Sequence, residues 1–111
     1  MRTLKFIVKG QKLSKDPNCD FSGIVAGTKG YLKAEFIFSD EWNGLIKVLG
    51  FSSNRMKEDI TFIKDDSILI PESILGDSRL IFRLTGVRSL NASNDLTIVT
   101  NKVRITQEGG M

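Results

Sequence analysis

Histidine is absent from this 111-residue chain, and cysteine occurs once, at Cys19. Histidine is the commonest general base and the commonest metal ligand in proteins, so both roles lose their usual residue. A Ser-His-Asp or Cys-His catalytic site cannot form, nor can a usual zinc site, which draws on several histidines or cysteines. A lone cysteine also excludes an internal disulfide, in agreement with a reducing compartment. We therefore expect no metal and no cofactor, while catalysis by carboxylates or lysine alone stays open.

Long apolar runs are also missing. No stretch of 18 apolar residues occurs, so we expect no transmembrane helix and no membrane partner. The N-terminal segment starts basic but contains no apolar stretch of signal-peptide length. Hydrophobic residues make up 41% of the chain and charged residues 26%, as in ordinary soluble globular proteins. These features favour a folded protein that is made in the cytoplasm.

Helical periodicity is rare, and the apolar residues instead recur at every second position, which is typical of strands with one buried face. This alternation is clearest in residues 4–9, 31–38, 80–85 and 102–106. Further strands are expected near residues 22–26, 45–52, 59–64 and 96–100. The segment 45–52 is apolar on both faces, which predicts either a central strand or a strand that faces a partner.

Turn residues separate these segments at intervals of about 10 residues, a spacing that indicates roughly seven or eight short strands. We predict an all-β fold, a two-sheet antiparallel sandwich of the immunoglobulin-like kind, with a small barrel as the second choice. One short helical turn is expected near residues 71–75, because Pro71 suits a first helical position and Gly76 can end the turn. Residues 1–108 should form one domain, followed by a flexible tail at 109–111. The residues expected in the core include Phe6, Phe36, Phe38, Phe82 and Leu84.

Acidic side chains raise the question of a calcium loop. Asp16, Asn18 and Asp20 have the spacing that opens an EF-hand loop. That loop then requires glycine at its sixth position and glutamate at its twelfth, where this chain has Phe21 and Gly27. We interpret the segment as a turn in which Asp and Asn side chains bind backbone N–H groups.

Two further patterns favour structural over chemical interpretations. The acidic pairs 40–41 and 65–66 could serve glycoside hydrolysis, but each lies among turn residues, where solvated carboxylates are usual. The glycine-rich stretch 23–30 lacks the Lys-Ser/Thr ending of a phosphate-binding loop and the helix that would follow it.

Trp42 lies between two predicted strands and has two possible roles. An exposed indole could stack on a sugar or contact a partner, so Trp42 is a candidate partner-binding residue. More often, such a residue folds back and closes one end of the sandwich.

Basic side chains suggest a second candidate surface. Sixteen lysines and arginines face thirteen acidic residues, a net charge of +3. Lys5 and Lys9 should point outward from the first strand, and Lys102 and Arg104 from the last. If those two strands are neighbours, as in many sandwiches, the four side chains form one basic ribbon. The ribbon would bind an acidic protein surface or nucleic acid; alternatively, lysines on edge strands only block aggregation.

Several segments carry a resemblance to a known family. They are residues 31–38 (YLKAEFIF), 42–44 (WNG), 70–75 (IPESIL), 100–105 (TNKVRI) and the glycines at 109–110. Together they resemble small β modules of bacteriophage and prophage virion proteins, over nearly the whole chain. The resemblance implies a role in capsid decoration, in a head fibre or in tail and baseplate assembly, and no catalytic residues come with it.

We therefore expect a non-enzymatic virion protein that is made in the host cytoplasm. Its partners would be other virion proteins, such as capsid or tail subunits, with the chain either forming a homo-oligomer or docked on a lattice. Nucleic acid is not the expected partner. The alternative is a small intracellular phage inhibitor that binds a host defence protein or a nucleic-acid machine.

Overall fold

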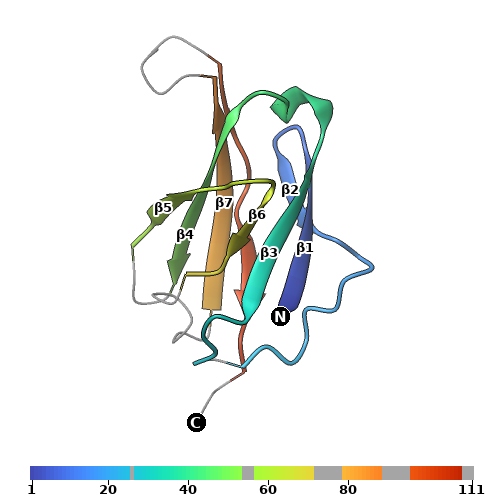
Figure 1. Cartoon of the computed structure of the whole chain (residues 1–111), viewed down its shortest axis with the longest axis vertical. Coiled ribbons are helices and arrows are strands. Elements are labelled where there is room, and N and C mark those ends of the chain that lie inside the picture. Colours follow the sequence, from blue (N-terminus) through green and yellow to red (C-terminus); the bar gives the residue numbers. More distant parts are fainter. Residues whose placement is uncertain (26, 54–56, 72–78, 89–95, 109–111) are drawn as a thin grey trace.

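A computed structural model describes residues 1–25, 27–53, 57–71, 79–88 and 96–108, and these residues form nine strands and one 3-10 turn (Figure 1). The strands are β1 (Arg2–Lys9), β2 (Lys12–Lys15), β3 (Leu32–Phe38), β4 (Ile46–Ser53), β5 (Asp59–Phe62), β6 (Ser67–Leu69), β7 (Arg79–Val87), β8 (Thr97–Val99) and β9 (Val103–Thr106). The 3-10 turn η1 (Asp40–Trp42) connects β3 to β4.

Two sheets contain all of these strands. The first has the order β2-β1-β3-β6, and the second has the order β5-β4-β7-β8, with β9 also paired to β7. The all-β prediction with two sheets is confirmed. The prediction of purely antiparallel pairing is wrong for β1 and β3, which run parallel with Phe6 opposite Phe36. The segment 27–31 leads to the start of β1, where the Arg2 N–H donates a hydrogen bond to the Tyr31 carbonyl (2.9 Å), so β3 begins beside the start of β1 and runs parallel to it.

The strand predictions succeed where the alternation is long. The four clearest segments became β1, β3, β7 and β9, and 45–52 became β4, a central strand between β5 and β7. The strand expected near 22–26 is wrong, because residues 22–25 form only an isolated bridge between Val25 and Glu108. The short strands β2 and β6 were not predicted. The expected helical turn, apart from Pro71, and the expected tail at 109–111 lie outside the described residues.

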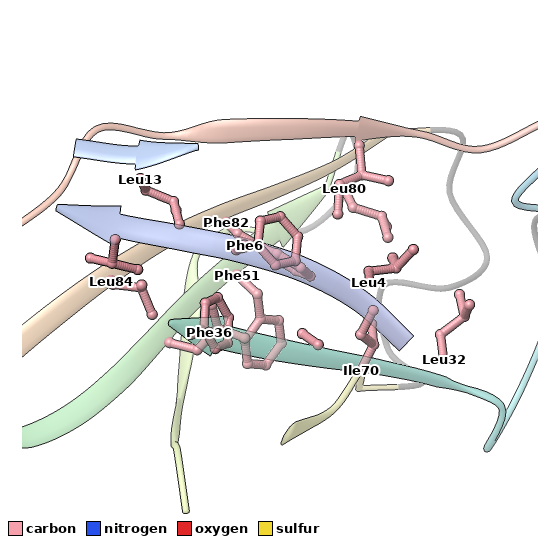
Figure 2. Packing of buried hydrophobic residues seen from close by; sticks show 14 of the residues in the cluster. Leu4, Phe6, Leu13, Leu32, Phe36, Phe51, Ile70, Leu80, Phe82 and Leu84 are labelled. Atoms are coloured by element: carbon pink, nitrogen blue, oxygen red, sulfur yellow. The ribbon is translucent and has the colours of Figure 1, made fainter. Parts of the chain in front are cut away.

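Aliphatic side chains and aromatic rings together fill the space between the sheets (Figure 2). The Phe6 ring stacks on Phe36 within its own sheet (5.3 Å between centroids) and meets Phe82 of the other sheet edge-on (5.9 Å). These three residues and Leu84 are buried, as predicted. Phe38 is only partly buried, and it packs between the core and the end of the sandwich.

A bulge separates β8 from β9, which both pair with β7. Thr85 lies opposite Val99, while Phe82 lies opposite Val103, so three steps along β7 correspond to four on the other side. This one extra residue is the signature of a β-bulge. The buried Thr100 stabilises it, since its hydroxyl accepts a hydrogen bond from the Leu84 N–H (2.9 Å).

Asn101, the next residue, joins the two sheets. Its Oδ1 accepts a hydrogen bond from the Leu13 N–H (2.7 Å), and its Nδ2 donates one to the Leu13 carbonyl (3.0 Å). The Gln11 side chain adds a bond to the Val99 carbonyl (3.1 Å). The amide of Asn101 thus hydrogen-bonds the N–H and the carbonyl of Leu13 at the edge of β2, as a neighbouring strand would.

The register predicts which residues of β3 carry stability. Phe36→Ala should lower the free energy of unfolding by about 3–5 kcal/mol, because it leaves a cavity between the sheets. Ile37→Ala is the matched control: this neighbouring side chain is 55% exposed, so its loss should change stability by only about 0.5 kcal/mol. Urea denaturation measures both values. Equal effects of the two substitutions would contradict the register of β3.

Candidate functional site

Trp42, one of the candidate partner-binding residues, is fully buried. Its Nε1 donates a hydrogen bond to the Gly10 carbonyl (2.9 Å), and its ring packs against Phe38 (5.2 Å between centroids). The structural interpretation, in which the indole closes one end of the sandwich, is therefore confirmed. The ring is not on the surface where it could meet a sugar or a partner.

The residues around Trp42 hold the β1–β2 turn in place. The Ser39 hydroxyl accepts a hydrogen bond from the Gly10 N–H (3.0 Å) and donates one to Glu41 (3.3 Å). Gly10 has a φ of +56°, a conformation that favours glycine. The turn 39–42 therefore serves the fold by fixing both polar groups of Gly10.

Gly86 of β7 provides the space for the indole, which sequence reasoning missed. A Cβ at this position would lie 2.6 Å from Trp42 Cζ3, far inside contact distance. A glycine in the interior of a strand is a signal that another group approaches the backbone closely. Trp42 therefore packs directly on the backbone of β7.

The loop after β2 contains the acidic pattern that resembled a calcium loop. The Asp16 carboxylate accepts a hydrogen bond from the Asn18 N–H (2.9 Å), and Asp20 accepts from the Ser22 N–H (2.8 Å) and hydroxyl (2.6 Å). The interpretation as a turn built by Asp side chains is confirmed. The Arg2 guanidinium completes the loop by donating to the carbonyls of residues 20, 22 and 23.

These contacts lower the pKa of the Asp20 carboxyl below its ordinary value of 3.8. The Ser22 hydroxyl has the largest effect and the Ser22 N–H the next, because both donate to the charged form. The positive charge of Arg2 adds to them, and together they outweigh the opposing effect of desolvation.

The two acidic pairs lie in turns. Asp40 and Glu41 are exposed in η1. Asp65 and Asp66 are exposed in the turn before β6, with φ values of 54° and 58°. Asp66 forms an ion pair with Lys47 (3.6 Å). In this part of the chain, the carboxylates therefore have the surroundings expected of solvated turns.

The basic ribbon does not form as one surface. Lys5, Lys9, Lys102 and Arg104 are all exposed, as expected. However, β1 pairs with β2 and β3, whereas β9 pairs with β7 in the other sheet. The condition for a single ribbon, neighbouring first and last strands, is not met. The four side chains instead form two pairs, one on the outer face of each sheet.

We name the outer face of the first sheet the lysine face. Its positions are those that alternate with the buried residues of β1 and β3. Lys5 lies opposite Glu35, Ile7 opposite Ile37, and Lys9 opposite Lys12. Its cationic side chains are all lysines: Lys5, Lys9, Lys12 and Lys33. This face is basic, with Ile7, Ile37 and Leu69 between the charges, and Ile37 and Leu69 are 55% and 48% exposed.

The outer face of the second sheet carries an apolar patch. One row of paired residues crosses four strands, β5, β4, β7 and β8. It runs in the order Phe62, Val48, Thr85 and Val99. None of these side chains belongs to the core cluster between the sheets. We define the apolar patch as Ile46, Val48, Ile60, Phe62, Val87 and Val99. Ile60 is 60% exposed and Phe62 56%, so the patch faces solvent.

Cations occupy the other end of the same face. Arg104 lies opposite Ile81, and Arg79 opposite Thr106. Arg83 lies opposite Gly50 and forms an ion pair with Glu58 across it. We define the basic end as Arg79, Arg83, Lys102 and Arg104. Among the residues that the structure describes, Lys102 and Arg104 form no ion pair.

Comparison with models of protein families, with curated proteins and with solved structures finds no match for this chain. Within the described ranges, no helix is long and apolar enough to cross a membrane. The two sheet faces are therefore the features on which a function can be argued.

The position of Gly86 predicts a packing defect. Gly86→Ala should displace the indole and lower the free energy of unfolding by about 1–3 kcal/mol, the usual effect of overpacking. Because Trp42 is the only tryptophan, its fluorescence should shift to longer wavelength as water reaches the ring. Gly50→Ala is the control, since a Cβ there meets the end of the flexible Glu58 side chain (3.0 Å). An unshifted spectrum for Gly86→Ala would refute this packing.

The lowered pKa of Asp20 predicts how the loop responds to acid. Because the folded pKa lies below that of the unfolded chain, the stabilisation is present above pH 3.8 and is lost as the pH falls through the folded pKa. An NMR titration of the Asp20 carboxyl should give a midpoint below 3.8. Ser22→Ala should raise that midpoint, whereas Ser14→Ala in β2 should not. A midpoint unaffected by Ser22→Ala would show that the hydrogen bonds are absent in solution.

Proposed function

We propose that this protein is a non-enzymatic virion component that docks on a larger protein assembly in a bacteriophage particle. The apolar patch is the observation that carries the proposal. The largest apolar patches on monomeric soluble proteins are often functional. The resemblance to phage virion modules supplies the class of assembly: capsid, head fibre, or tail and baseplate.

A binding role also agrees with where the polar side chains lie. The acidic pairs at 40–41 and 65–66 are exposed in turns, and Asp16 and Asp20 bind the backbone of their own loop. We propose that the two sheets form an immunoglobulin-like module that binds its partner through an outer face of a sheet. Such modules typically act through surfaces and loops and need no cofactor.

The partner that we propose is another virion protein. On the lysine face, isoleucines lie between the cations, and on the other outer face the cations lie beside an apolar patch. Binding to nucleic acid would favour a continuous basic groove that follows the phosphates, with aromatic rings for the bases. The protein would be made in the host cytoplasm and would reach the particle by docking on capsid or tail subunits, alone or as a homo-oligomer.

Purified particles test this proposal. Particles induced from a lysogen that carries the gene should contain the protein in many copies after density-gradient purification, as measured by quantitative mass spectrometry against the major capsid protein. A non-structural protein of the same phage serves as the control for contamination. If the protein is absent from particles and is recovered from cells on a host defence protein, the intracellular inhibitor replaces this proposal.

A further inference from the structure

We propose that the outer face of the second sheet, and not the lysine face, is the docking surface, and that the partner surface is an acidic protein surface with an apolar part. The inference rests on the proposed function and names the chemistry of its partner. Two features of this face carry it: the apolar patch at one end and the basic end beside it.

The apolar patch reaches the lower end of the size range of the largest patches on monomeric proteins, which are often functional. Ile60, Phe62 and Val99 are 60%, 56% and 37% exposed, which together leaves roughly 300 Å² of apolar surface in water. Val48 lies between Phe62 and Thr85 in the same row and is only 8% exposed, so the patch is a packed surface. An aromatic side chain set among packed aliphatic ones is typical of the residues that contribute most to binding.

The basic end sets the charge of the partner. In the part of this face that the structure describes, Arg83 is the one cation of the basic end that forms an ion pair, and its partner is Glu58. Covering Lys102 and Arg104 with a neutral or basic surface would desolvate them without a counter-charge, which is unfavourable. A partner with carboxylates at this end would pair them and would also steer association.

The kind of cation separates the two faces. The lysine face carries only lysines, whereas three of the four cations of the basic end are arginines. Arginine is enriched in protein interfaces and lysine is depleted, because the guanidinium is more weakly hydrated and binds carboxylates in a bidentate manner. Lysine on an edge strand instead prevents unwanted pairing, and of these four lysines Lys12 lies on the edge strand β2. The lysine face therefore lacks the arginines that favour an interface.

A second copy of this chain does not fit the docking surface. In a face-to-face dimer with its two-fold axis parallel to the strands, the basic end would meet the basic end of the other copy. With the axis perpendicular to the strands, the basic end would meet the apolar patch. An offset dimer over the patch alone would bury far less than the roughly 800 Å² per partner of a stable interface.

Allele replacement in the lysogen tests the choice of face. One variant, Ile60→Ser with Phe62→Ser, removes the centre of the apolar patch, and a second, Lys102→Glu with Arg104→Glu, reverses the basic end. The matched control, Lys5→Glu with Lys9→Glu, reverses as many charges on the lysine face. All substituted side chains are exposed, and urea midpoints of the purified proteins should establish that each variant folds.

Both variants of the docking surface should reduce the number of copies per purified particle at least about tenfold, the effect of losing one or two strong contacts. The control should stay within about twofold of the wild type. Washing wild-type particles at rising salt should release the protein, because salt screens the exposed charges over about 8 Å at physiological ionic strength. Release by salt and loss in both variants would support the inference.

Three results would overturn it. Normal incorporation of both variants with loss of the control would assign docking to the lysine face. A wild-type dimer in sedimentation that Ile60→Ser with Phe62→Ser converts to a monomer, with unchanged incorporation, would make a second copy the occupant. Absence of the wild-type protein from particles would reject the proposed function itself, a result distinct from the other two because it does not depend on the variants.

Discussion

The contact between Phe6 and Phe82 holds the two sheets together, and most of the structure depends on it. Phe6 also stacks on Phe36, so one ring connects three strands in two sheets. Because side chains alternate along a strand, placing these rings inside decides which neighbours point outward. The exposure of Lys5 on one face and of Arg104 on the other follows from that placement.

Two side chains that lie outside the strands connect or close the sandwich. Asn101 binds both backbone groups of Leu13 across the gap between the sheets, and Trp42 closes one end by lying on Gly86. Both residues belong to segments from which the sequence analysis predicted a phage virion module. In the structure, both residues have structural roles. The surface that we propose for docking consists largely of other residues.

The sequence predicted which single residues of the candidate surface are exposed. It did not predict which of them lie together on one face. The exposure of Lys5, Lys9, Lys102 and Arg104 follows from alternation and was predicted correctly. Their separation onto two faces was not, because it depends on β9 pairing with β7. The apolar patch was predicted only in part: the segment 45–52 was expected to be a central strand or to face a partner, but Ile60 and Val99 join it only through strand pairing.

By itself, the sequence determined the all-β class, the long strands and most of the core, because a period of two is a local property. The absence of histidine also limited the chemistry open to the chain, since composition alone decides which side chains can act. Only the tertiary structure decided that β3 runs parallel to β1 and that β9 lies in the second sheet. It also decided that Trp42 turns inward. Each of these outcomes depends on contacts between residues far apart in the chain. A local sequence pattern does not indicate the free energy of such contacts.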